Sequence, residues 1–332
     1  MNPRIRPFER VYVEDAARDH PGTKRVLEQL ASSRVIGIDH YKDLFNRPRQ
    51  DWRAQKKTPS LILARRREDF LYDASAYTPD FGHPRFFYNA LALNCVYDCG
   101  YCYLQGMFPG AHVTLFVNNE DYLAAAEEAL REGPLYLALS YDTDLLTFEH
   151  LLPHAREWLA FARERPGLTV EIRTKSSRYN LLRNIRPLPN AVLAWTLSPQ
   201  PVIDRHEAMT PSLKHRLRAA SMAMADGWPV RICIDPILRV PDWETVYSDF
   251  IDELAAALDL SMALDFSLGV FRINKDYLKN MKQRAAPSAI LHYPYQTTNG
   301  LATYPQVLRD DMIGLVRERL RRHVGEERIF VT

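Results

Sequence analysis

Three of the chain's four cysteines lie in one short segment, NALALNCVYDCGYCYLQGMF, which covers residues 89–108. Cys95, Cys99 and Cys102 have the spacing C-x3-C-x2-C, and Cys233 lies far from them in the sequence. A closed structural zinc site needs four ligands, which the local cysteines do not supply. Three thiolates suit a [4Fe–4S] cluster, because cluster irons bind cysteine and one iron then stays open to an outside molecule.

An open iron indicates a specific chemistry. We hypothesise that S-adenosylmethionine binds this iron and, after one-electron reduction, is cleaved to a 5′-deoxyadenosyl radical. Such a reaction needs a one-electron reductant, for example a flavodoxin or a ferredoxin. The alternative from outside catalysis is a metal-binding module, which would be colourless with zinc, whereas an iron–sulfur protein absorbs visible light.

The composition is that of an ordinary globular protein, with 332 residues of which 46% are hydrophobic and 25% are charged. The net charge of +2 does not by itself indicate a nucleic-acid binder. No stretch approaches the roughly 20 apolar residues of a membrane span, and the N-terminus lacks the apolar region of a signal peptide. We therefore expect a monomeric cytoplasmic protein without membrane contact, in which clustered cysteines bind metal rather than form disulfides.

The elements that must position the cysteines alternate between strand and helix from residue 85 onward. The first predicted strand, 86–94, runs directly into the cysteine loop. Such alternation predicts parallel β/α units, as in a TIM-like barrel or part of one, with function at the carboxyl ends of the strands. The later strands are predicted at 112–118, 135–140, 169–175, 192–198, 229–237 and 261–271, and the helices at 119–132 (capped by Asn119), 147–166, 180–185, 210–227 (capped by Thr210) and 243–258.

The region before residue 85 reads as short strands and one helix, interrupted by a basic stretch over residues 47–67. Asp51 is the only acid among its many lysines and arginines. Two interpretations remain open: a solvated linker that ends in a strand, or a surface that contacts phosphates with Trp52 available for stacking.

The segment CVYDCGYC resembles the C-x3-C-x-Φ-C motif of the radical S-adenosylmethionine superfamily, with Tyr101 at the Φ position. The runs CGYCYLQ, VTLFVN, IRTKS and IDPI, together with most of the remaining chain, resemble the spore photoproduct lyase family. This resemblance implies an α/β fold with a partial (β/α)6 TIM-like barrel. We expect a small N-terminal α/β region with a basic linker at 1–84, the barrel at 85–275 and a C-terminal extension that closes the substrate pocket at 276–332.

The resemblance also assigns residues to a cofactor site. It implies that the three clustered cysteines bind the [4Fe–4S] cluster and that Tyr101 contacts the adenine of S-adenosylmethionine. Lys175 would reach the cofactor's carboxylate, although a surface lysine in a loop is the alternative. Ser198 would hydrogen-bond the cofactor or else cap a turn, and Thr143 is a weaker candidate of the same kind.

Two departures from the family pattern lie on the substrate side. Where DNA-repairing members carry a cysteine that returns a hydrogen atom to the product radical, this chain has Tyr141, with Tyr103 as a second member of the relay. Where those members have an arginine–tyrosine pair near the lesion, this chain has Thr303 and Tyr304, so a guanidinium with bidentate reach is missing. We predict Tyr141, Tyr103 and Tyr304 as catalytic residues.

Cys233 alternates with Arg231 and Asp235 in a predicted strand, so the three side chains are expected on one side of it. Cys233 is either a replacement hydrogen donor or a buried free cysteine that behaves as a small hydrophobe. Two substrates follow from the whole pattern. The first is a thymine-derived photolesion in DNA, flipped out of the duplex for repair, and the second is a different substrate on the same radical scaffold.

Overall fold

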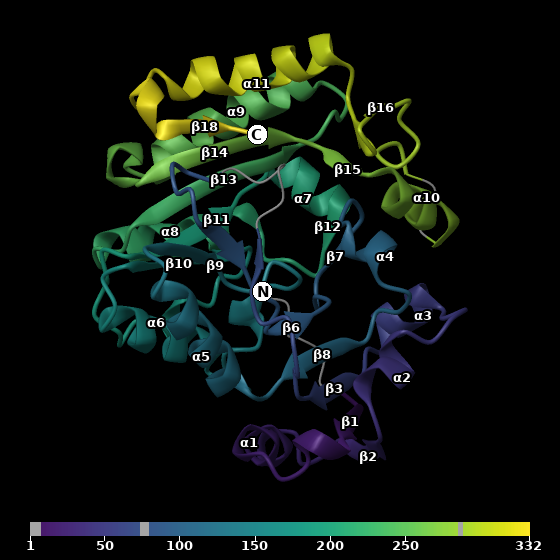
Figure 1. The fold of residues 1–332 in the computed structure, drawn as a ribbon. Helices are drawn as coiled ribbons and strands as arrows, with labels where there is room; N and C mark the ends of the chain where they lie inside the picture. Colours follow the sequence, from purple (N-terminus) through teal and green to yellow (C-terminus); the bar gives the residue numbers. More distant parts are fainter. Residues whose placement is uncertain (1–7, 74–79, 285–287) are drawn as a thin grey trace.

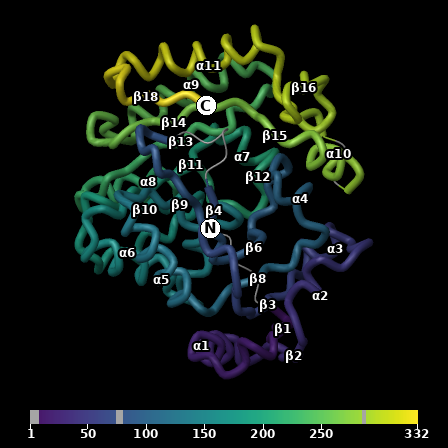
Figure 2. The backbone as a smooth tube through the Cα atoms, in the orientation of Figure 1, coloured from purple at the N-terminus to yellow at the C-terminus, as the bar shows by residue number. Residues whose placement is uncertain are grey.

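A small, largely parallel sheet forms the N-terminal part of the protein, at the lower end of Figures 1 and 2. The computed structural model describes residues 8–73, 80–284 and 288–332. In this sheet the strand order is β2-β1-β3-β8-β6, with only β6 antiparallel to its neighbour. The elements of this part are β1 (Arg10–Glu14), α1 (Pro21–Gln29), β2 (Arg34–Ile38), α2 (Tyr41–Phe45), α3 (Trp52–Lys57), β3 (Leu61–Ala64), β6 (Ala92–Leu93) and β8 (Val113–Phe116).

A larger curled sheet with the order β18-β14-β13-β11-β10-β9-β5-β4 follows, and its described strands are parallel except for β4 at one edge. Helices cover its outer face (Figure 1). This arrangement confirms the predicted α/β partial barrel. Its elements are β4 (Tyr72–Asp73), β5 (Phe86–Tyr88), α5 (Asn119–Leu130), β9 (Leu135–Ala138), α6 (His154–Arg163), β10 (Leu168–Thr174), β11 (Ala191–Thr196), α8 (Leu213–Ala225), β13 (Val230–Ile237), α9 (Trp243–Ala257), β14 (Asp265–Val270), α11 (Gln306–Leu320) and β18 (Ile329–Val331).

The barrel interior is divided between an ion network and a cavity. Every residue of β9 and of β11 is buried, as parallel strands covered on both faces require. Near the amino ends of the strands, Arg231 bonds Asp265 through two nitrogens and Glu171 at 2.5 Å. This network fills one end of the barrel with paired charges, so the open space lies at the carboxyl ends of the strands.

Four local predictions were wrong. The strand predicted at 112–118 appears as β8, but it pairs with β3 and β6 in the small sheet rather than with the barrel. The helix predicted over 147–166 begins at His154, because Pro153 occupies the N-cap position and residues before it form a short 3-10 turn. Helix α8 is capped at Ser212 rather than at Thr210, and α5 at Asn118 rather than at Asn119.

The C-terminal extension packs against the cysteine loop. It contains most of α10 (Lys275–Arg284), together with β16 (Gln296–Thr298) and β17 (Leu301–Thr303). Strand β17 pairs with β16 and with β15 (Arg272–Asn274), which directly precedes the extension. Helix α10 contacts the short helix α4 (Leu104–Met107). Gly106 permits this approach, since a Cβ atom there would lie 2.2 Å from the carbonyl oxygen of Tyr277. Asn280 and Arg284 also donate side-chain hydrogen bonds to backbone carbonyls of this loop.

Candidate functional site

The cysteine loop is held from several sides. Strand β7 (Asp98–Cys99) pairs antiparallel with β12 (Glu207–Ala208), which follows α7 (Gln200–His206). The Lys56 ammonium donates to the carbonyl oxygens of Cys95 and Tyr97 at 2.7 and 2.6 Å. The loop that carries the three thiols therefore has a defined backbone path.

The three clustered thiols are held close to one another in the loop. Burial raises the pKa of Cys95 and of Cys99 to about 12, and it also raises that of Cys102. Because burial raises the pKa of Cys233 in the same way, it is the grouping of three thiols, and not their pKa, that suits the iron atoms of a cluster. Among the described residues, no three His, Cys, Asp or Glu side chains are grouped to hold a single metal ion.

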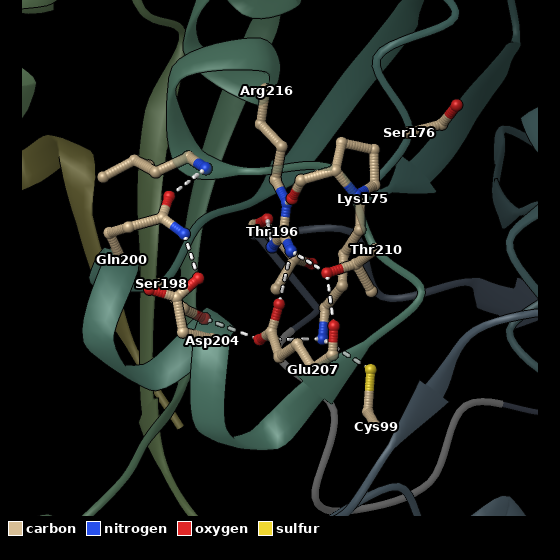
Figure 3. Close-up of polar contacts among 12 residues, drawn as sticks. Cys99, Lys175, Ser176, Thr196, Ser198, Gln200, Asp204, Glu207, Thr210 and Arg216 are labelled. Carbon is tan, nitrogen blue, oxygen red and sulfur yellow. Dashed lines mark hydrogen bonds and ion pairs between the residues drawn. The ribbon is translucent and has the colours of Figure 1, made fainter. Parts of the chain in front are cut away.

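Glu207 is the centre of a buried polar network beside these thiols (Figure 3). One of its carboxylate oxygens accepts hydrogen bonds from the Tyr101 hydroxyl, the Lys175 ammonium at 3.1 Å and the Ser198 hydroxyl at 2.9 Å. The other accepts from the Arg216 guanidinium at 2.5 Å. The two cations, Lys175 and Arg216, outweigh the effect of burial and lower the pKa of Glu207 to about 2.

Arg216 completes this network from helix α8. It is fully buried and also donates to the carbonyl oxygens of Pro211 and Thr196 and to the Thr210 hydroxyl. The hydroxyl of Thr210 in turn donates to the backbone oxygen of Glu207 at 2.7 Å. Thr210, predicted as a helix cap, thus serves to fix the network instead.

The predicted cofactor residues lie close together but have different surroundings. Lys175 donates to the Tyr101 hydroxyl at 2.6 Å and lies 3.6 Å from the Cys99 sulfur. Ser198 is buried and bonded to Glu207, so Ser198 reaches Lys175 and Tyr101 through that carboxylate. Thr143 is buried, and its hydroxyl has no hydrogen-bond partner in the described part of the chain. Their predicted contacts with S-adenosylmethionine remain predictions.

A cavity of about 610 Å³ opens beside the loop at the carboxyl ends of the barrel strands. The cysteine loop and residues after 275 both contribute to its wall. Closure of the pocket by the extension remains a prediction. The described residues that line it include Tyr88, Cys99, Tyr101, Cys102, Tyr103, Met107, Tyr141, Asp142, Arg173, Lys175, Thr196, Asp235, Pro236, Phe271, Arg272, Ile273, Asn274, Tyr277, Asn299, Gly300 and Leu301.

Two of the predicted catalytic tyrosines line this cavity. The Tyr103 hydroxyl donates to the carbonyl oxygen of Tyr141 and to the carboxylate of Asp142, both at 3.0 Å. Burial raises the pKa of Asp142 to about 6. The Tyr141 hydroxyl is buried without a hydrogen-bond partner among the described residues, and the Arg173 guanidinium lies 5.6 Å from its ring centre.

Arg173 and Arg272 are cavity residues that the sequence did not single out. Arg173 bonds Glu171 at 3.1 Å through Nε, and its Nη2 is buried without a partner in the described chain. Both terminal nitrogens of Arg272 donate hydrogen bonds to the Asp235 carboxylate, at 2.9 and 3.2 Å. Arg272 also stands opposite Thr303 in the β15–β17 ladder. A guanidinium is therefore present beside the position where the sequence lacks one.

Tyr304 and Cys233 lie behind the cavity wall. The Tyr304 side chain is only 1% exposed, and its hydroxyl accepts a hydrogen bond from the Arg239 amide at 3.0 Å. Cys233 is fully buried on β13, and burial raises its pKa to about 12. Neither is among the described residues that line the cavity. A catalytic role for Tyr304 remains a prediction, without direct access to a ligand in this arrangement.

The basic residues of the stretch at 47–67 lie in two different surroundings. Arg65 pairs with Asp121 of α5 at 3.1 Å, and Arg66 bonds the backbone of Glu68 and the hydroxyl of Tyr72 in β4, so both are bonded within the protein. Arg53 and Lys56 instead line a groove of about 780 Å³ on the other side of the cysteine loop. This groove shares none of its described lining residues with the cavity.

Sequence reasoning missed Glu207, Arg216 and Arg272. Arg216 had a visible signal, because it falls on the apolar stripe formed by Leu213, Leu217 and Ala220 in its helix. A buried arginine requires an acid, and Glu207 is a nearby candidate. Arg272 had no such signal, since its place opposite Thr303 depends on the pairing of two short strands.

Comparison with known proteins identifies the family. The family model described as "SPL: Spore photoproduct lyase" matches residues 7–296. A spore photoproduct lyase of Geobacillus sp. (strain Y412MC61) is 25% identical over 238 residues, which is 69% of this chain and 67% of the relative. One from Bacillus subtilis (strain 168) is 22% identical over 277 residues, which is 80% of this chain and 78% of the relative.

Solved structures show the same fold. A spore photoproduct lyase complexed with dinucleoside spore photoproduct superimposes with a TM-score of 0.82 at 21% identity, covering 98% of this chain and 99% of that one. A mutant of such a lyase with bound AdoMet and the same dinucleoside gives a TM-score of 0.81 at 21% identity and the same coverage. No helix in the described residues is long and apolar enough to span a membrane. The family match across most of the chain shows that this protein belongs to the spore photoproduct lyase family.

Proposed function

We propose that this protein is a radical S-adenosylmethionine enzyme that repairs a thymine-derived photolesion in DNA. The observation that carries the proposal is the composition of one cavity. Two of the clustered thiols and Lys175 lie on one part of its wall, and the guanidinium groups of Arg173 and Arg272 lie on another. A cofactor that generates a radical and a substrate rich in hydrogen-bond acceptors would therefore meet in one space.

The cofactor part of the cavity provides ligands and charge. Cys95, Cys99 and Cys102 would hold a [4Fe–4S] cluster, which together with S-adenosylmethionine supplies a radical that abstracts hydrogen from carbon. The Lys175 ammonium is placed beside the Cys99 sulfur at 3.6 Å and would bind the carboxylate of the cofactor. Glu207 fixes Lys175 and Tyr101 in position before any ligand arrives, which is how a site becomes preorganised.

The substrate part of the cavity suits a thymine dimer. Relatives have been solved with a dinucleoside spore photoproduct, whose base carbonyls are hydrogen-bond acceptors. Arg173 has an unpartnered nitrogen in the described chain, and Arg272 occupies the ladder position opposite Thr303. We propose that these two guanidinium groups take over the grip on the lesion that the missing arginine provides in other members.

Tyr141 is proposed to return the hydrogen atom to the product radical. Its hydroxyl lacks a partner in the described residues, and the residue lines the cavity. Tyr103 holds the backbone of Tyr141 through a 3.0 Å hydrogen bond, so the two tyrosines form a connected pair. Tyr103 is 36% exposed, so we propose that the bound substrate itself excludes the water that a radical intermediate must avoid.

A second function has its own support. Tyr141 stands in place of a thiol donor, and Cys233 is not among the residues that line the cavity. A phenol and a thiol differ in acidity and in reach. A radical enzyme on the same scaffold that acts on a different substrate is therefore the second candidate.

One anaerobic assay separates the two candidates. The cluster-reconstituted protein is incubated with S-adenosylmethionine, dithionite and dinucleoside spore photoproduct, and chromatography measures 5′-deoxyadenosine and the repaired dinucleotide. Repair of the lesion supports the first candidate. Release of 5′-deoxyadenosine without repair supports the second, and a protein that retains no iron–sulfur absorption contradicts both.

A further inference from the structure

The cysteine loop lies between the cavity and the groove, and some of its residues line one while some line the other. Cys99, Tyr101 and Cys102 line the cavity, whereas Asp98 and Gly100 line the groove of about 780 Å³ on the other side. The pairing of β7 with β12 continues this division, because Glu207 points to the buried network while Ala208 lines the groove. The groove is therefore the outer surface of the segment that carries the cysteines.

The groove is strongly basic, although the chain as a whole carries a net charge of only +2. Arg53, Arg205 and Arg239 are exposed on it, and Lys56 is half-buried. None of these four side chains forms a salt bridge with a carboxylate of the described residues. Asp98 is the single acid among the described lining residues. The positive charge is thus available to an outside partner.

The groove also has apolar lining residues. Met209 is 39% exposed, and Ala208, Val240 and Ile290 line the groove with it. Met209 also has a φ of 69°, a left-handed backbone conformation that L side chains rarely adopt. An exposed methionine together with arginines is a combination that protein interfaces favour.

We infer that this groove is the docking site for an acidic protein that donates one electron, of the flavodoxin type. The inference rests on the proposed radical function and names the partner that it needs. One electron would leave the flavin of the donor, which is oxidised by one electron, and reduce the cluster by one. Opposite charge would steer the donor, and a small interface suffices for a transient redox encounter.

The groove and the cavity lie on opposite sides of the cysteine loop, which would allow reduction and substrate binding at the same time. A donor in the groove approaches the cysteine loop from the side opposite the cavity, so substrate and S-adenosylmethionine can stay in place during reduction. DNA phosphates would also be attracted to Arg53 and Lys56. However, a lesion must enter the cavity, which shares none of its described lining with the groove. The groove is therefore better suited to the donor than to the DNA strand that carries the lesion.

The test uses the reconstituted holoenzyme and its Arg205→Glu/Arg239→Glu variant. Arg322→Glu is the matched control, since Arg322 is exposed just beyond α11 and forms no salt bridge in the described chain. An acidic flavodoxin is the probe, and its dissociation constant is measured by interferometry at several salt concentrations. Stopped-flow absorption follows reduction of the cluster by reduced flavodoxin and, separately, by dithionite.

We expect the double variant to weaken flavodoxin binding by roughly tenfold or more, to slow reduction by flavodoxin to a similar degree, and to leave reduction by dithionite unchanged. The control should behave as the unmodified protein does. Unchanged flavodoxin binding in the double variant would overturn the inference. So would a loss of affinity for a lesion-containing duplex with flavodoxin binding retained, which would assign the groove to DNA. Failure of dithionite to reduce a cluster would instead contradict the proposed function itself.

Discussion

The two parts of the cavity wall differ in how completely their polar groups are paired. On the cofactor part, Lys175 and Tyr101 bond Glu207, which is not a lining residue and is bonded in turn by the buried Arg216. On the substrate part, the Tyr141 hydroxyl and one nitrogen of Arg173 are buried without partners among the described residues. Buried polar groups are rarely left unpaired, so the unpaired ones mark where a ligand is expected to complete the bonding.

This difference separates two kinds of function in one site. A polar network that is complete without a ligand orders its side chains before the cofactor binds, and it would give the cofactor a preorganised binding site. An incomplete set of polar groups discriminates among substrates, because only a molecule with matching acceptors satisfies it. The cofactor part of the wall carries Cys99, Tyr101 and Cys102 of the sequence motif, and Tyr141, which we predict as a departure from the family pattern, belongs to the substrate part.

The largest expected effect is on the cofactor part. Cys102→Ala removes one of three thiolate ligands, so we expect the visible absorption of the reconstituted protein and its release of 5′-deoxyadenosine to fall to background. Cys233→Ala is the control, because it also removes one thiol but at a fully buried position outside the cavity lining. A Cys102→Ala protein that keeps a full cluster would contradict the ligand assignment.

The next effect concerns the stability of the complete network. Glu207→Gln leaves Arg216, which is fully buried, and Lys175 without a counter-charge. Breaking a buried ion pair costs about 3–5 kcal/mol, and we expect a loss of that size in the free energy of unfolding, measured with urea. A double variant, Glu207→Gln/Arg216→Met, should recover part of the loss, since no buried guanidinium then remains. A loss below about 1 kcal/mol would show that Glu207 is not the centre of the network.

A smaller effect is expected at Arg272. Arg272→Gln removes the guanidinium opposite Thr303, and we expect affinity for the dinucleoside lesion to fall roughly tenfold, from the loss of charged hydrogen bonds. Cleavage of S-adenosylmethionine without substrate should be unchanged. Arg272→Lys keeps a positive charge beside Asp235 and serves as the control for geometry. Equal lesion affinity in all three proteins would remove Arg272 from the proposed substrate site.

The smallest effect on stability is expected at Tyr141. Its hydroxyl has no partner in the described chain, so Tyr141→Phe should leave the free energy of unfolding within about 0.5 kcal/mol of the original. Tyr136→Phe is the contrasting variant, because the Tyr136 hydroxyl bonds Glu171 and Arg231 at 2.6 and 2.7 Å. That variant should lose about 1–3 kcal/mol.

Tyr141→Phe should nevertheless change the chemistry. If the phenol returns a hydrogen atom, its loss should divert the product radical to side products while 5′-deoxyadenosine release continues. Chromatography of the reaction products measures this split. An unchanged product distribution would exclude Tyr141 as the donor and leave the second candidate function with less support.

The sequence predicted the features that depend on neighbouring residues and failed for those that depend on distant segments. The C-x3-C-x2-C spacing, the alternation of strands and helices, and the local run that ends in Lys175 were readable directly, because each depends on neighbours along the chain. The sheet to which β8 belongs was not readable, since a short buried strand has the same pattern in either sheet.

The sequence by itself therefore determined the chemistry that this protein can hold: three local thiols, a barrel to present them and the family to which the pattern belongs. Tertiary structure alone decided which charges meet. A two-residue strand pair places Glu207 opposite Cys99, next to Lys175 and Arg216. A three-residue pair places Arg272 opposite Thr303. Such encounters depend on the packing of segments distant in sequence, whose pairing no local pattern records.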